Sequence, residues 1–177
     1  MHPDPSTPVD STKAHRRKLR LTSADDLLRE AHRLAEAEAA GTLRRTGNWS
    51  LGRALAHLAA WTDTAYDGFP PEFQLPHWIL RLLMRPFKRV MLARTLPAGI
   101  RLPRVEGGTH FIDPASTDEG LRRLERTVQR VRSTDPVHAN VLLGPLTRAE
   151  CERLLLRHAE LHLSFFHTDD THPGSGE

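Results

Sequence analysis

The sequence predicts an all-α fold, with helices packed around one hydrophobic core. Four segments repeat apolar residues at intervals of three and four, and each starts at a Ser, Thr or Asn residue that can cap a helix. No segment shows a convincing alternation of apolar and polar residues, which would indicate a strand. A chain of 177 residues is long enough for a single domain that buries about two-thirds of its unfolded surface.

Composition divides the chain into one domain and two tails. Residues 1–15 contain three prolines and almost no apolar side chains, so we predict a disordered N-terminal tail. Residues 16–167 contain all the helical patterns, and the polar, glycine-containing residues 168–177 are predicted to be a flexible tail. The chain has neither the apolar core of a signal peptide nor a run of about 18 apolar residues. We therefore expect no membrane span and a cytoplasmic location.

The first two helices are predicted from their caps and apolar faces. The first covers residues 22–40 and ends before Gly41, because glycine favours the left-handed backbone that follows many helices. The second covers residues 48–67. Its buried side consists of Leu51, Ala54, Leu55, Leu58 and Trp61. His57 lies on the flank of that side, where it is either a satisfied core residue or an inward-facing ligand.

An extra apolar and basic segment lies between the second and third main helices. Residues 78–94 are apolar nearly all round and carry five Arg and Lys residues, and Pro86 must kink or break a helix there. Two interpretations stay open: a helix packed on one side under its long cationic side chains, or a basic surface for lipid headgroups or an acidic partner. Residues 96–114 follow as a long irregular loop, in which His110 is a candidate for lining a site.

The last two helices have clear start signals. One covers residues 116–132 and has two acidic residues in its first turn, where they interact favourably with the helix dipole. The other covers residues 147–166 and starts with a capping box, because Thr147 can cap the first turn and Glu150 can reach back. Both carry an apolar stripe at helical spacing, so we expect both to pack on the core.

The last helix carries a pair of histidines on its apolar face. His158 and His162 are four residues apart, so their side chains share one side of the helix, with Cβ atoms roughly 6 Å apart. A bound cation would satisfy both rings inside this apolar surface, and His57 could supply a third ligand. The alternative stays open, because this spacing also arises by chance and a histidine can be an ordinary core residue.

Charge and cysteine content argue against several functions. The formal net charge is +3, which is too small to favour nucleic-acid binding, where affinity depends on clustered cations. The single cysteine, Cys151, excludes an internal disulfide. Because it lies on the apolar face of the last helix, we expect a buried packing thiol rather than a nucleophile.

Two stretches carry a resemblance to a known superfamily. Residues 46–58 contain the sequences TGNWSLG and AHL, and residues 158–162 have the sequence HAELH. In these motifs the chain resembles the DinB-like (YfiT-like) superfamily, and within it a bacterial domain family of unknown function, over roughly residues 17–167. The resemblance implies a DinB-like four-helix bundle of up-down-down-up topology that binds a divalent metal ion. The implied metal ligands are His57, His158 and His162.

The resemblance also implies a metal-dependent activity. Superfamily members with known activity include transferases and isomerases that use low-molecular-weight thiols such as mycothiol or bacillithiol. We therefore predict an enzyme of the thiol-dependent transferase or hydrolase type, with a small-molecule substrate and such a thiol as a candidate partner. Zinc is the expected ion, with nickel, manganese and iron as alternatives. The competing hypothesis is a non-catalytic bundle whose histidines are core residues or hold a structural metal, and which acts as an interaction or homodimerisation module.

The residues around the implied metal depart from the superfamily pattern. Many relatives have an Arg-Gly-Gln-like stretch after the second histidine of the pair, where this chain has the sequence LSF. The implied substrate site therefore does not carry over, and Trp61, Asp63 and Ser164 are only candidates for lining the approach. Glu160 lies two residues from each histidine of the pair and points to the opposite face, which makes it a poor general base for a metal-bound water.

Overall fold

The computed structural model describes residues 9–70, 85–99, 111 and 113–168. Within these residues the chain is mostly helical, which confirms the predicted all-α class. The long helices are α1 (Ala24–Ala39), α2 (Leu51–Asp67), α5 (Thr117–Ser133) and α6 (Arg148–Leu163). A short helix, α4 (Lys88–Ala93), follows a 3-10 turn at Arg85–Phe87.

Each long helix starts at a cap that the sequence indicates. The cap residues are Ser23, Ser50, Ser116 and Thr147. Each hydroxyl accepts a hydrogen bond from the backbone N–H three residues further along. At the starts of α1 and α6 the pairing is reciprocal, because Asp26 and Glu150 accept from the backbone N–H of the cap residue. These bonds satisfy donors that a helix leaves unpaired, and so they fix where each helix begins.

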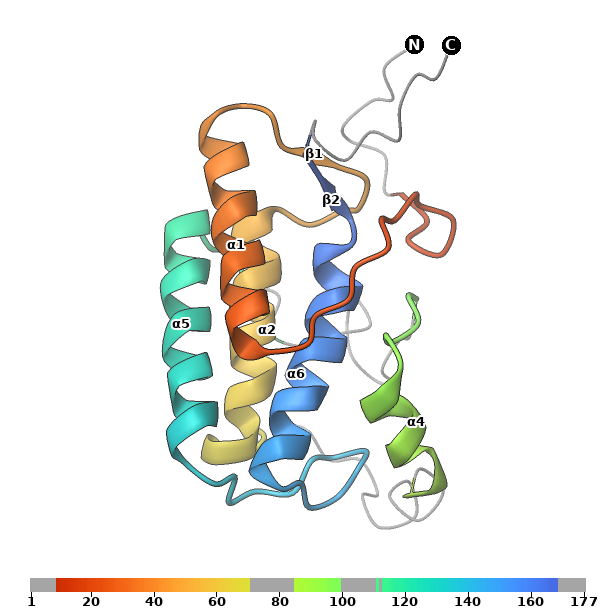
Figure 1. Ribbon diagram of the computed structural model, residues 1–177, viewed down its shortest axis with the longest axis vertical. Coiled ribbons are helices and arrows are strands. Elements are labelled where there is room, and N and C mark those ends of the chain that lie inside the picture. Colours follow the sequence, from red (N-terminus) through yellow and green to blue (C-terminus); the bar gives the residue numbers. More distant parts are fainter. Residues whose placement is uncertain (1–8, 71–84, 100–110, 112, 169–177) are drawn as a thin grey trace.

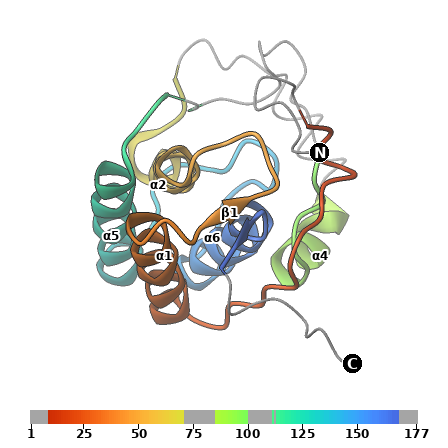
Figure 2. The same cartoon turned by 90° about the horizontal axis from the view of Figure 1, so that it is seen from above.

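The four long helices lie alongside one another (Figures 1 and 2). In Figure 1, α1 and α6 run in one direction, and α2 and α5 run in the other. Their facing sides form the core, whose largest buried apolar side chains include Leu27, Leu34, Leu51, Leu55, Leu58, Leu124, Leu155, Leu163 and Phe166. α4 lies beside α6, on the side away from α1 and α5 (Figure 2).

Two glycines allow the starts of α2 and α5 to approach closely. A Cβ atom added at Gly120 would lie 2.4 Å from the carbonyl oxygen of Gly52. A Cβ atom added at Gly52 would lie 2.4 Å from the carbonyl oxygen of Ala115. Both distances are far below van der Waals contact, so any larger residue would push these helices apart. The glycine pair therefore sets the position of α2, which carries His57.

A small antiparallel sheet is a difference from the sequence prediction. β1 (Arg44–Arg45) pairs with β2 (Phe166–His167), whereas the sequence predicts no strand, because two-residue strands are too short to show alternation. α6 accordingly ends at Leu163, before the predicted end at residue 166. The hydroxyl of Ser164 donates to a carbonyl of the last helical turn, and this bond competes with continuation of the helix.

The predicted extra segment, residues 78–94, is described only from residue 85 onward. Pro86 lies in the 3-10 turn and α4 begins at Lys88, which agrees with an interruption at the proline. The Lys88 ammonium donates to the Pro145 carbonyl (2.9 Å) and to Glu150 (2.9 Å). This cation therefore ties α4 to the start of α6 instead of contributing to a free basic surface.

The chain before α1 runs back along α6. The Arg17 backbone N–H donates to the carbonyl of Ser164 (3.0 Å) at the end of α6. Further along, the backbone N–H of Leu21 donates to Glu160 (2.8 Å), and the Leu21 carbonyl accepts from Arg157 (2.6 Å). These bonds attach the segment to α6 at two positions before α1 begins.

Part of the predicted N-terminal tail, residues 1–15, makes defined contacts. The backbone N–H groups of Lys13 and Ala14 both donate to the Asp10 carbonyl at 3.0 Å, forming a turn. The Asn48 side chain accepts from the Val9 backbone N–H (2.7 Å) and donates to its carbonyl (2.8 Å). The amide of Asn48 thus holds the start of the described chain beside the start of α2.

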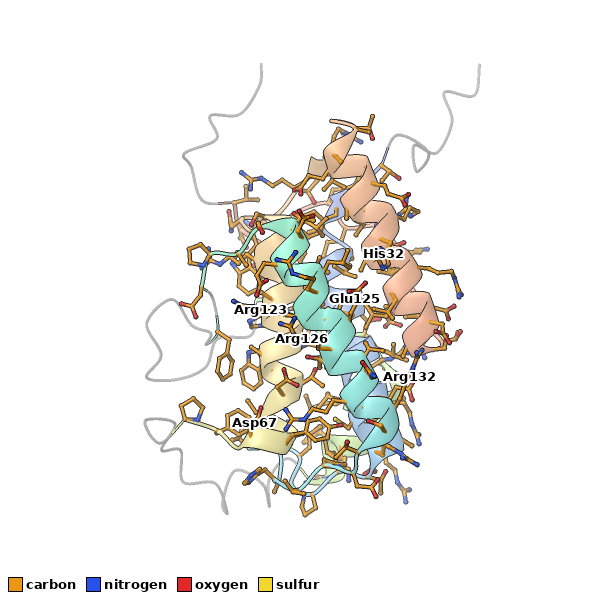
Figure 3. The ribbon with its side chains drawn as sticks, turned by 90° about the vertical axis from the view of Figure 1, so that its left-hand side faces the viewer. His32, Asp67, Arg123, Glu125, Arg126 and Arg132 are labelled. Atoms are coloured by element: carbon orange, nitrogen blue, oxygen red, sulfur yellow. The ribbon has the colours of Figure 1, made fainter. Side chains whose placement is uncertain are left out.

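The outer faces of α1 and α5 carry charged side chains with partners. His32 on α1 has its Nε2 3.0 Å from a carboxylate oxygen of Glu125 on α5, and its side chain is 49% exposed. Figure 3 shows these two side chains on adjacent helices. Arg132 pairs with Asp25 at 2.6 Å.

Among the described helices, none is long and apolar enough to cross a membrane.

Candidate metal centre

Three histidines from two helices meet inside the fold. His57 comes from α2, and His158 and His162 come from successive turns of α6. One ring nitrogen from each residue lies within 4.8 Å of the other two. The Nε2 atoms of His158 and His162 are 3.0 Å apart. The structure thus brings together the three residues that the sequence singled out as candidate ligands.

The backbone of Phe111 orients the His57 ring. The Nδ1 atom of His57 lies 3.3 Å from the Phe111 carbonyl oxygen. A ring that donates its Nδ1–H to a carbonyl keeps a lone pair on Nε2, which is the arrangement of many metal-binding histidines. Phe111 has a φ of 58°, in the left-handed region that is uncommon for residues other than glycine. A strained backbone position therefore supports a candidate ligand.

Two tryptophans enclose the histidines. The Trp49 ring lies parallel to the His162 ring, with centroids 4.9 Å apart and 4° between the planes. It also meets the His57 ring edge-on at 4.8 Å. Trp61, one turn after His57, has its ring 6.3 Å from the His158 ring. Trp49 belongs to the motif TGNWSLG, but the sequence indicates no role for it. A position just before the α2 cap does not reveal where the side chain points.

Burial keeps the α6 histidines uncharged. Burial lowers the pKa of His158 well below its usual value of 6.5, and the nearby His57 lowers it further. The same two effects lower the pKa of His162, with an added contribution from His158. Neutral imidazole is the form that binds a metal ion, since the proton and the ion compete for the same lone pair. Both side chains are therefore in the ligating form at neutral pH.

These lowered pKa values predict acid destabilisation of the metal-free protein. In the unfolded chain these histidines bind protons near pH 6.5, and in the folded chain they do not. The stability that the two histidines contribute is therefore fully present above that pH and is lost as the pH falls below it. The free energy of unfolding should fall by up to about 1.4 kcal/mol per pH unit for each histidine until the folded pKa is reached. Urea unfolding in a chelating buffer, from about pH 7.5 to about pH 5, measures this slope.

The matched control for this prediction is a double variant, His158→Asn with His162→Asn. It removes both α6 histidines, while His167, whose pKa is also lowered by burial, and the carboxylates that titrate at lower pH stay in place. We expect a flatter pH dependence in the double variant. An equal slope in the two proteins would contradict the assignment of this pH dependence to the α6 histidines.

A cavity of about 730 Å³ opens beside the histidines. All three rings line it, and so do Trp61 and Cys151. Two other residues that the sequence suggested for the approach lie elsewhere: the Ser164 hydroxyl donates to a backbone carbonyl, and Asp63 accepts from Thr127 on α5. Neither is among the described residues that line the cavity.

The cysteine and the glutamate of α6 have structural surroundings. Cys151 is buried, as predicted, and burial raises the pKa of its thiol, so it is protonated at neutral pH. Glu160 is fully buried on the opposite side of α6, where it accepts from Leu21 and pairs with Arg157 at 2.7 Å. It therefore does not face the histidines. The candidate residue His110 lies outside the described residues.

The three imidazoles form a chemically reasonable ligand set. Zinc and other divalent transition metals bind nitrogen ligands of this kind, often three from the protein with the remaining positions open. Within the described part of the chain, the cluster contains no fourth His, Cys, Asp or Glu side chain. The residues present therefore fit a divalent ion with coordination positions left for another molecule.

Comparison with family models gave a match over residues 13–169. The matching family is described as a protein of unknown function (DUF1569). The matched range contains every described helix and all three histidines. Comparisons with curated proteins and with solved structures gave no significant match.

Proposed function

We propose that this chain, which belongs to the DUF1569 family of proteins of unknown function, binds a divalent metal ion through His57, His158 and His162 and uses it in catalysis. The observation that carries the proposal is the convergence of three imidazoles from two helices at the wall of a cavity. A structural site needs no adjoining cavity, whereas a catalytic one needs room for a substrate.

We further propose that the fold is a DinB-like four-helix bundle of up-down-down-up topology. The helix directions in Figure 1 support this proposal, because α1 and α6 run opposite to α2 and α5. The distribution of the three histidines supports it as well, with one on the second long helix and two on the last. We also propose that residues 16–167, the predicted domain, form one folded unit.

The proposed reaction is a thiol-dependent transfer or a hydrolysis. A divalent ion supplies a Lewis acid that can lower the pKa of bound water to about 7 or favour a thiolate. The contribution of this chain is to hold the ion with neutral imidazoles, to orient His57 through Phe111, and to exclude bulk water with Trp49 and Trp61. Zinc is the proposed ion, with nickel, manganese or iron as alternatives, and a small molecule in the cytoplasm is the proposed substrate.

A non-catalytic interaction module is the second candidate. The observation in its favour is that two apolar side chains at α4 are exposed: Phe87, just before the helix, is 55% exposed, and Val90, within it, is 48% exposed. Exposed apolar residues of this kind can belong to a partner or homodimer surface. In that case the histidines would hold a structural ion, and its fourth coordination position would be closed.

The state of the remaining coordination positions separates the two candidates. We would load the protein with Co(II) and record its near-ultraviolet and visible absorption before and after adding azide or a small monothiol. A changed spectrum, with a sulfur-to-cobalt band for the thiol, is expected for an open site. A spectrum that neither ligand alters would indicate a closed site and contradict the catalytic proposal. His162→Ala, which removes one ligand, serves as the control for specific loading.

A further inference from the structure

The cavity beside the histidines is elongated along two helices. On α6 its lining extends from Cys151 to His162, and on α2 it extends from Ala54 to Ala65. Each stretch rises by about 16 Å, because an α-helix rises 1.5 Å per residue. The histidines lie toward the C-terminal part of the α6 stretch, Phe165 and Phe166 line the cavity just past them, and Leu142 and Leu143, in the connection before α6, line the opposite part. The cavity therefore has room for a long molecule with one end at the histidines.

Beyond the histidines, the wall is largely apolar. Its aliphatic side chains include Met91, Leu142, Leu143, Leu146, Leu154 and Leu155. They come from α4, from the connection before α6 and from α6 itself, so the apolar surface continues across several elements. Such a wall favours the hydrocarbon part of a ligand, because binding removes apolar surface from water on both sides.

Three polar side chains along this wall, those of Thr62, Thr64 and Asn140, already have partners in the fold. The hydroxyl of Thr62 donates to the Leu58 carbonyl at 2.8 Å, and that of Thr64 donates to the Trp61 carbonyl at 2.7 Å. The Asn140 side-chain oxygen accepts from two backbone N–H groups at 2.9 and 3.0 Å. These groups are therefore largely committed to the backbone.

Charge is sparse on the same wall. Among the described lining residues, Asp10 is the only one with a charged side chain. One of its carboxylate oxygens accepts from the backbone and the hydroxyl of Thr12. A carboxylate or phosphate on the body of a ligand would lose its hydration here without a cationic partner on the described wall, and that loss is costly.

We propose that the cavity binds an elongated, uncharged molecule that has one polar group at the histidines and an apolar body along the α2–α6 wall. This inference rests on the proposed function for the role of the polar group, which would occupy the metal's open position. The substrate class is then a medium-chain or aromatic compound with a single polar end, such as an alcohol, amide or ester.

Displacement of Nile red, an uncharged apolar dye, tests this class. Butanol, hexanol and octanol are added as competitors of the dye, and so are the carboxylates with the same chain lengths. The competition is measured in metal-free and in zinc-loaded protein. In the metal-free protein we expect affinity for the alcohols to rise about fourfold per methylene, as for a buried CH₂ group. In the same metal-free protein, where the described wall supplies no cation, each carboxylate should bind about tenfold or more weakly than its alcohol. Equal or tighter carboxylate binding in the metal-free protein, or no dependence on chain length, would overturn the inference.

A matched pair of variants shows whether the dye is in this cavity. Leu142→Trp fills the part of the cavity away from the histidines, and Val137→Trp places the same ring in the same connection, at a residue that is 74% exposed and outside the lining. We expect at least tenfold weaker dye binding for the first variant and no change for the second. Leu154→Trp is a second filling variant, in case circular dichroism shows that Leu142→Trp does not fold. Wild-type dye affinity in a folded filling variant would overturn the inference.

The same samples separate this inference from the proposed function. One outcome is that the wild type binds the dye and the alcohols, and loses that binding in the filling variant, although it binds no zinc. That result would support the ligand class while the metal proposal fails. Zinc binding without any dye or alcohol binding would overturn the ligand class while the metal proposal stands.

Discussion

Replacing His158 by alanine is expected to weaken zinc binding by more than about 100-fold. Loss of a group that only orients a ligand already costs about 10–100-fold in metal affinity, so loss of a ligand itself should cost more. The three candidate ligands are mutual neighbours, because the His158 ring lies 5.1 Å from the His57 ring and 4.7 Å from the His162 ring, and the His57 and His162 rings lie 4.8 Å apart. The dissociation constant, measured by competition with a chromophoric chelator, gives the size of the effect.

Two controls make the His158 result specific. Elemental analysis of protein purified without a histidine tag or added metal should find close to one divalent ion per chain, lost in the variant. His32→Ala removes a half-exposed histidine on the outer face of α1, and it should bind zinc as the wild type does. If the wild type binds neither zinc, nickel nor manganese after reconstitution, the metal proposal is wrong, and the histidines are core residues.

Replacing Glu160 by alanine should lower the free energy of unfolding by about 3–5 kcal/mol, because it leaves a buried cation without its partner. The Arg157 and Glu160 side chains are 4% and 0% exposed and lie 2.7 Å apart. Glu160 also accepts from the Leu21 backbone N–H and from the Thr95 hydroxyl (2.5 Å). The substitution therefore leaves two further donors without their acceptor.

Two comparisons identify the origin of this loss. Glu160→Gln keeps an oxygen for the Leu21 N–H and removes only the charge, so it should lose less stability than Glu160→Ala. Glu125→Ala removes an exposed carboxylate from a surface pair and should change the free energy of unfolding by less than about 0.5 kcal/mol. Urea unfolding of the three variants measures these differences. A loss below about 1 kcal/mol for Glu160→Ala would contradict a buried ion pair.

Local signals explain what the sequence predicts well. The four long helices have strong caps and regular apolar spacing, and both are properties of residues near each other in the chain. The histidine pair is visible for the same reason, since His158 and His162 are one helical turn apart. The placement of His57 beside them depends on how α2 packs against α6, so periodicity alone left two interpretations of His57 open, a core residue and a ligand.

Long-range partners explain what the sequence does not predict. Arg157 and Glu160 look like surface residues of a helix, and the groups that make their burial favourable, the Leu21 backbone and the Thr95 hydroxyl, are distant in the sequence. The β1–β2 pair joins residues 44–45 with 166–167, which no local pattern connects. The position of Trp49 against His162 likewise depends on the approach of α2 to α6.

The split of the histidines between α2 and α6 sets an order of assembly. His57 is made early in synthesis, but the cluster requires His158 and His162, which lie about 100 residues later, and α6 must then pack against α2. A nascent chain that lacks α6 offers a metal ion one imidazole from this cluster instead of three. Tight metal capture by this cluster would therefore be a late event, coupled to the docking of the last helix, so that the bound ion reports on a completed fold.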